Sequence, residues 1–125
     1  MTAYLDTHVL VWIAKGEDHH LSPGARESIE NDDLLVSPAV LLELESLHEI
    51  GRLRASAEKT LSFLESEIGL SVCILPFHEV VTQALKEKWT RDPFDRLIVA
   101  NAKAADAPLV TKDERIRKHY RRAIW

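Results

Sequence analysis

The 125-residue sequence has few of the residues that mark several classes of protein. It contains one cysteine, four glycines and five prolines, with no biased segment and no internal repeat. A single cysteine excludes an internal disulfide, and Cys73 stands in an apolar run, where it most simply fills core space. Scattered glycine and proline exclude collagen-like, low-complexity and wholly disordered chains. The length leaves room for one domain, residues 1–125, with one core.

Long apolar runs are also missing. No segment approaches the roughly 20 apolar residues that a membrane-spanning helix needs, and the amino terminus lacks the basic and apolar regions of a signal peptide. We therefore expect a cytoplasmic protein without membrane contact. The sequence also lacks a Gly-rich phosphate loop, paired Cys or His residues at zinc spacing, and the His-Glu spacing of metalloproteases. No such motif points to a nucleotide or zinc site.

The net charge of −4 argues against a nucleic-acid partner, but the charge is unevenly distributed. From Thr111 onward, six basic residues stand against two acidic ones, whereas the first 110 residues hold ten basic and eighteen acidic residues. This asymmetry indicates a polyanion or an acidic partner near the carboxyl-terminal segment, although a solvated basic helix has the same composition.

Short apolar strands alternate with amphipathic helices along the chain. We expect strands at 3–5, 34–36, 72–75 and 109–110, an edge strand at 123–124, and helices at 7–15, 23–31, 39–52, 56–68, 78–88, 92–105 and 113–120. The alternation predicts an α/β three-layer sandwich, with a central parallel sheet of four to five strands flanked by helices. Ligands of such sheets collect beyond the carboxyl ends of the strands. Asp6 and the segment after Val110 occupy such positions.

One glutamate falls where its helix should be apolar. In the helix after Ser37 the predicted apolar stripe contains Val40, Leu44, Leu47 and Ile50, and helical phase places Glu43 within it. A carboxylate in an apolar stripe is costly by several kcal/mol unless it is paired or binds a cation. Glu45 and Glu49 share the opposite face and are expected to need no partner.

Four aspartates raise the same question, and each also has a purely structural explanation. Asp95 lies in the apolar stripe of its helix, but an acid in a first turn also suits the helix dipole. Asp92 is more readily a helix cap before Pro93. Asp113 stands two residues after Thr111, a candidate cap, and is by itself more readily a first-turn acid that suits the helix dipole. Asp6, at the end of a strand, can likewise cap the next helix.

The four carboxylates Asp6, Glu43, Asp95 and Asp113 converge on one prediction. Four acids in one pocket would repel each other and take up protons. Mg2+ or Mn2+ removes this repulsion, because hard divalent cations prefer oxygen ligands and also bind phosphate oxygens. Such a site supports phosphodiester hydrolysis by activated water. A strand-end aspartate also serves phosphatases of the haloacid dehalogenase type, but these have a second aspartate where this chain has His8.

Four blocks span the chain in order: Tyr4–Trp12, Ser37–Pro38 leading to Glu43, Arg91–Ala100, and Leu109–Asp113. Together they resemble the motifs of PIN-domain ribonucleases, specifically VapC-type toxins of type II toxin-antitoxin systems. The resemblance implies a single PIN domain that cleaves RNA such as tRNA, rRNA or mRNA, is inhibited by a cognate VapB-type antitoxin, and forms a homodimer.

The resemblance also implies roles for individual residues. Asp6, Glu43 and Asp95 are expected to hold Mg2+ or Mn2+, while Asp113 binds a second ion or orients water. Thr7, His8 and Asp92 are candidates for supporting these ligands, and helix capping is an equal alternative for Thr7. The candidate contacts to the RNA backbone are Arg91, Arg96, Arg115, Arg117 and Lys118, with a surface salt bridge as the alternative for Arg96.

Two other functions remain open from the residues alone. A PIN-like domain can act as a catalytically silent regulatory binding module, in which the carboxylates are only caps; the presence of all four acids argues against this. A nuclease directed at DNA or at flap structures would have the same acidic residues.

Overall fold

The computed structural model describes all 125 residues. The strands are β1 (Thr2–Leu5), β2 (Asp33–Val36), β3 (Ser71–Val72), β4 (Leu109–Val110) and β5 (Ala123–Ile124). The helices are α1 (Thr7–Ala14), α2 (Pro23–Asn31), α3 (Pro38–Glu49), α4 (Ala57–Ile68), α5 (Phe77–Ala84), α6 (Pro93–Ala104) and α7 (Glu114–His119), with a 3-10 turn, η1, at Asp18–His20. No helix has both the length and the apolar character that crossing a membrane requires.

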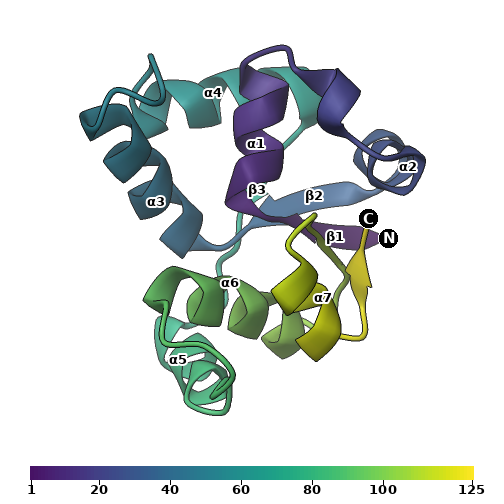
Figure 1. Ribbon diagram of the computed structural model, residues 1–125, viewed down its shortest axis with the longest axis vertical. Coiled ribbons are helices and arrows are strands. Elements are labelled where there is room, and N and C mark those ends of the chain that lie inside the picture. The colour runs from purple at the N-terminus through teal and green to yellow at the C-terminus, as the bar shows by residue number, and fades with distance from the viewer.

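A five-stranded sheet in the order β3-β2-β1-β4-β5 forms the middle layer, and every strand pair is parallel. Helices α1, α3 and α4 lie on one side of it, and α5, α6 and α7 on the other (Figure 1). The three-layer α/β sandwich predicted from the sequence is confirmed, including the edge strand at 123–124. Parallel strands need crossover connections, and the helices supply them while covering both faces of the sheet.

The strand order reverses direction at β1. The chain proceeds from β1 outward to β2 and β3, then returns to place β4 and β5 on the other side of β1. Leu5 pairs with Val110, so the residues that follow these strands, Asp6 and Thr111, emerge side by side. In open parallel sheets such a switch point leaves a crevice at the carboxyl ends of the strands. The fold therefore positions a site between the starts of the helices that follow β1 and β4.

Local sequence signals set most helix starts. Ser22, Ser37 and Ser56 each accept a hydrogen bond from a backbone N–H in the first turn of the helix that follows. Proline at the first helical position follows two of these serines, as its fixed φ and missing N–H allow. The sheet and the inner helix faces enclose one main core of 24 buried residues.

Three expected elements end three or four residues earlier than predicted. The helix expected at 39–52 ends at Glu49, and the next residue, Ile50, is exposed. The strand expected at 72–75 covers only Ser71–Val72, and Ile74 beyond it is 96% exposed. The helix expected at 78–88 ends at Ala84, and its buried residues are Val80 and Ala84, whereas Leu85 is 63% exposed. The predicted elements are too long because these segments contain apolar side chains that are exposed. A sequence pattern does not distinguish an exposed apolar side chain from a buried one.

The segment between α5 and α6 contains a buried ion pair that the sequence analysis missed. Glu87 is only 2% exposed and accepts hydrogen bonds from Lys103 Nζ at 2.7 Å and Trp89 Nε1 at 2.7 Å. Burial acts to raise the pKa of Glu87, but these hydrogen bonds and the Lys103 charge outweigh it and hold the pKa below its ordinary value. Lys103, on α6, thereby anchors the segment that leads to Asp92.

Replacing Lys103 by methionine is expected to lower the free energy of unfolding by about 3 kcal/mol near neutral pH, because Glu87 would remain buried without its partner. A carboxyl with a lowered folded-state pKa stabilises the fold above its unfolded pKa of 4.5, and this contribution is lost as pH falls through the folded value. The difference between Lys103→Met and wild type should therefore shrink in acid. Urea denaturation measures it, with the exposed Lys118→Met as control. A loss of equal size at both ends of the pH range would contradict the ion-pair explanation.

Candidate active site

A pocket of about 300 Å3 opens at the switch point of the sheet. Its lining includes all four carboxylates that the sequence analysis selected. The lining residues are Asp6, Thr7, His8, Val11, Trp12, Glu43, Leu47, Asp95 and Asp113. The acids come from four separate segments, namely the ends of β1 and β4 and the helices α3 and α6. The tertiary fold therefore brings the four predicted acids to one place.

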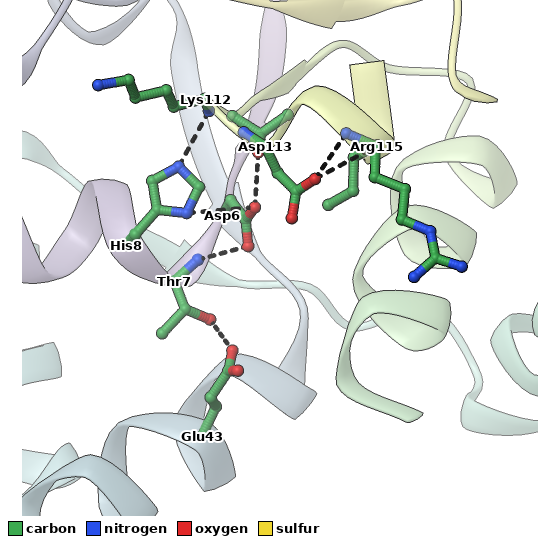
Figure 2. Close-up of polar contacts among 9 residues, drawn as sticks. Asp6, Thr7, His8, Glu43, Lys112, Asp113 and Arg115 are labelled. Carbon is green, nitrogen blue, oxygen red and sulfur yellow. Dashed lines mark hydrogen bonds and ion pairs between the residues drawn. The ribbon is translucent and has the colours of Figure 1, made fainter. Parts of the chain in front are cut away.

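Asp6 is the most enclosed of these acids, at 4% exposure, and both of its oxygens are engaged. Oδ1 accepts a hydrogen bond from the Thr7 backbone N–H at 2.8 Å, which caps α1, and Oδ2 accepts one from the Thr111 hydroxyl at 2.6 Å (Figure 2). Asp6 therefore both caps a helix and lines the pocket, so the two alternatives considered for it are not exclusive.

His8 lies between Asp6 and the segment after β4. Its Nε2 accepts a hydrogen bond from the Lys112 backbone N–H at 2.9 Å, and its Nδ1 faces Asp6 Oδ2 at 3.5 Å (Figure 2). Because Nε2 accepts, the neutral ring carries its proton on Nδ1, directed at the carboxylate. This geometry suits the supporting role expected for His8.

Glu43 reaches the pocket from α3 and accepts a hydrogen bond from the hydroxyl of Thr7 (Figure 2). Since Asp6 caps α1, the Thr7 hydroxyl orients Glu43 rather than capping the helix. Burial raises the pKa of Glu43; the Thr7 hydrogen bond opposes this, and the nearby charges of Asp6 and Asp92 add to it. Helical phase thus identified a carboxylate whose surroundings disfavour its charge.

Among the four pocket acids, Asp95 has the pKa that is raised furthest. Burial raises its pKa to about 7, with further contributions from the negative charges of Asp92, Asp6, Asp113 and Glu43. Asp92 is exposed and caps α6, as expected, by accepting hydrogen bonds from the N–H groups of Phe94 and Asp95. It does not line the pocket, but its charge acts on a carboxylate that does.

The cap of α7 is Asp113 and not Thr111, so the expected cap at Thr111 and the first-turn position expected for Asp113 are wrong. Asp113 itself caps α7, because its Oδ1 accepts hydrogen bonds from the N–H groups of Arg115 and Ile116 (Figure 2). Thr111, considered as the cap, is fully buried; its hydroxyl donates to Asp6 and accepts from the Asp113 N–H at 3.1 Å. Thr111 joins two pocket acids, a role for which its place after a buried strand was the available signal.

Glu45, in contrast to our expectation, has a partner. Its Oε1 accepts a hydrogen bond from the Ala57 backbone N–H at 2.9 Å, at the start of α4. Glu49 on the same face is exposed, as is Ile50, which is 66% exposed and not part of the apolar stripe. Only Glu49 is therefore suitable as a neutral control for Glu43.

The predicted basic contacts divide into bound and free side chains. Arg96 donates twice to the Ala84 carbonyl at the end of α5, so it is neither a surface salt bridge nor free for a ligand. Arg91 donates to the carbonyl of Lys88, and Arg115 to that of Trp89. Arg117 and Lys118, on α7, are exposed.

The pocket can be tested for its fit to a divalent cation. No group of three or more His, Cys, Asp or Glu side chains is close enough together to form an assembled metal site. Two other properties fit a hard cation: the convergent donors are carboxylate oxygens, and burial together with the charges of the neighbouring acids raises the pKa of Asp95 to about 7. The pocket thus has the donors and the uncompensated charge, and its carboxylates would draw together around an ion.

Comparisons with known proteins agree with this geometry. The family model described as PIN domain matches residues 3–122. Ribonuclease VapC22 of Mycobacterium tuberculosis is 38% identical over 121 residues, covering 94% of this chain and 92% of the relative.

Two solved structures share the fold. The structure of VapBC2 from Rickettsia felis bound to a promoter DNA fragment has a TM-score of 0.63 at 20% identity, and covers 94% of this chain and 92% of that one. VapBC-1 from nontypeable Haemophilus influenzae has a TM-score of 0.56 at 20% identity, with 94% of both chains covered. The resemblance found in the four sequence blocks is confirmed, and the chain belongs to the PIN domain family, in its VapC group.

Proposed function

We propose that this protein is a divalent-cation-dependent endoribonuclease, the toxin of a VapBC-type pair, acting in the cytoplasm. The observation that carries the proposal is the convergence of Asp6, Glu43, Asp95 and Asp113 in one pocket at the switch point of the sheet. The name of the relative, Ribonuclease VapC22, supports RNA as the substrate.

Each acid has a proposed task. Asp6, Glu43 and Asp95 would hold Mg2+ or Mn2+, and Asp113 would hold a second ion or orient water. When bound, the cation neutralises charge on the scissile phosphate and makes water a stronger nucleophile. The hydrogen bonds from Thr7 to Glu43 and from Thr111 to Asp6 fix the carboxylates, and ligands oriented in this way bind cations more tightly.

RNA binding is proposed for the basic side chains beside the pocket. Arg115, Arg117 and Lys118 lie on α7, which Asp113 caps, and Arg91 precedes the cap of α6. All four are exposed. Arg96 is left out because it is half-buried and its guanidinium donates two hydrogen bonds to the Ala84 carbonyl. Contacts between these cations and phosphates would make RNA affinity fall as salt rises.

A protein partner also belongs to the proposal. Both solved structures of similar fold are of VapBC proteins, which supports a VapB-type antitoxin as the inhibitor. Leu42 on α3 is 63% exposed, and Ile50, directly after α3, is 66% exposed. Phe63 on α4 is 47% exposed. Apolar side chains of this kind are ones that an antitoxin segment or a second copy of the chain would cover.

The test is cleavage of RNA by the purified protein. We expect cleavage with Mg2+ or Mn2+, a loss of at least about a hundredfold with excess chelator, and recovery when the cation is restored, because the clustered carboxylates cannot replace the cation's positive charge. Gel analysis of an end-labelled RNA and of the matching single-stranded DNA measures this.

The alternatives give different results in the same assay. Cleavage of the DNA alone would indicate a DNA-directed nuclease, and folded protein that cleaves neither nucleic acid would indicate a binding module. Cleavage that survives the chelator would contradict the proposed cation.

A further inference from the structure

Trp12 lines the same pocket as the four acids, but the proposed hydrolysis gives it no task. It lies on α1, six residues after Asp6, and is partly buried. Trp89 offers a comparison, because its indole N–H donates to Glu87 at 2.7 Å and the side chain is thereby fixed in the fold. Trp12 makes no such bond, although its indole nitrogen is not among the buried atoms without a partner. The indole N–H of Trp12 is therefore neither bonded to another residue nor fully buried.

Trp12 packs against the main hydrophobic core on one side, and its other neighbours are aromatic rings and a cation. The ring centroid of Trp125, at the carboxyl end of the chain, lies 5.9 Å from that of Trp12. The ring centroid of His8 lies 5.0 Å from that of Trp12, and the centroid of His20 lies 4.9 Å away with the planes tilted by 31°. His19 continues the series, with its centroid 4.2 Å from that of His20. The rings thus run from the acidic pocket out along the surface beside α1.

The ammonium group of Lys112 lies next to these aromatic rings. Lys112 Nζ lies 5.9 Å from the Trp12 ring centroid, and the Lys112 backbone holds His8 at the pocket. Lys112 is exposed and pairs with no carboxylate among the ion pairs of the structure. A flat π surface beside a free cation is the combination that binds single-stranded nucleic acid, since bases stack on the ring and phosphates meet the charge.

We propose that Trp12, flanked by His20 and Lys112, is a base-stacking subsite for the nucleotide adjoining the scissile phosphate of single-stranded RNA. The inference rests on the proposed ribonuclease function and deepens it. Stacking tolerates any base, so the subsite selects unpaired RNA over paired RNA rather than one sequence. It makes Trp12 a positioning residue, which places the phosphodiester against the carboxylates without touching the reacting atoms.

The test separates stacking from charge. A twelve-nucleotide oligouridine and a ribose-phosphate chain of the same length without bases are compared for binding, with Mg2+ present. Every protein carries Asp95→Asn to prevent cleavage, and binding is followed by fluorescence anisotropy. The variants are Trp12→Ala, Trp12→Phe and, as control, Phe77→Ala, an exposed aromatic of α5 outside the pocket.

We expect Trp12→Ala to weaken oligouridine binding by roughly 5- to 150-fold and to leave binding of the base-less chain unchanged. Trp12→Phe should retain most of the affinity, and Phe77→Ala all of it. An equal loss on both ligands, or no loss on either, would overturn the subsite, because Trp12 would then act only in packing or in a protein interface. The cleavage assay is independent: an active wild type with these negative binding results refutes the subsite alone, whereas an inactive wild type refutes the ribonuclease function.

Discussion

Replacing Asp95 by asparagine is expected to lower the rate of RNA cleavage by roughly a thousandfold, equivalent to about 4 kcal/mol of transition-state stabilisation. Asp95 projects from the first turn of α6 into the pocket, where four other acids act on it. Asparagine has nearly the same shape but supplies no negative charge. Single-turnover cleavage at saturating RNA measures the effect on the chemical step.

The same variant should be more stable than wild type in cation-free buffer. The pKa of Asp95 is about 7 in the folded protein and 3.8 ordinarily, so folding disfavours the charged form. The destabilisation is absent below the ordinary pKa, grows as pH rises toward 7 and is complete above it. Asp95→Asn should therefore gain about 2 kcal/mol at about pH 8 and nothing near pH 3.

Calorimetry across this pH range, with and without Mn2+, gives a second readout. Binding of Mn2+ to the folded state stabilises the folded protein, and the variant lacks one of the proposed carboxylate ligands. Mn2+ should therefore raise the melting temperature of wild type more than that of Asp95→Asn. If Asp95→Asn cleaved RNA at the wild-type rate, or were less stable than wild type at high pH, Asp95 would be only a first-turn acid of α6.

The second large effect is expected for Glu43→Gln, again roughly a thousandfold loss of cleavage. Glutamine can still accept the hydrogen bond from Thr7, so the fold should be retained while the charge is removed. Glu49→Gln is the matched control, because Glu49 is exposed on the same helix. Parallel cleavage assays and circular dichroism spectra of the two variants provide the measurement.

Thr7→Val extends this comparison to the residue that orients Glu43. The methyl group replaces the hydroxyl without changing the size of the side chain, and we expect a loss of about 10- to 100-fold. Equal damage from Glu49→Gln and Glu43→Gln would show that helical phase does not separate the pocket acid from the solvated one.

Periodicity predicted the existence and order of the elements well, but not the extent of the weaker ones. The helices with a clear cap, such as α3 after Ser37, begin within one residue of the expected position. Strand β3 and helix α5 were overestimated because Ile74 and Leu85 are apolar and yet exposed. An apolar residue satisfies a sequence pattern whether or not another part of the chain covers it.

The candidate acids were also accessible from the sequence, while their supporting contacts were not. Asp6, Glu43, Asp95 and Asp113 could be chosen from strand ends and helical phase. The bond from Thr111 to Asp6 joins residues 105 positions apart. Neither local propensity nor periodicity contains information on such a pair.

Buried charge illustrates the same limit. Glu87 follows the end of α5 in a polar segment, where the sequence indicates a solvated side chain; only the approach of α6 supplies Lys103 and encloses the pair. Glu45 likewise acquires a partner from the start of α4.

What the single cysteine determined was that the fold is held together by a core rather than by an internal disulfide. Local patterns further determined the helices, the strands and four acids in unusual positions. The tertiary structure alone decided that these acids share one pocket, that burial and neighbouring charges raise the pKa of Asp95, and that Trp12 lines the same pocket. The physical reason is that repulsion, burial and stacking act through space over a few ångströms, and the reversal of strand order at β1 sets those distances.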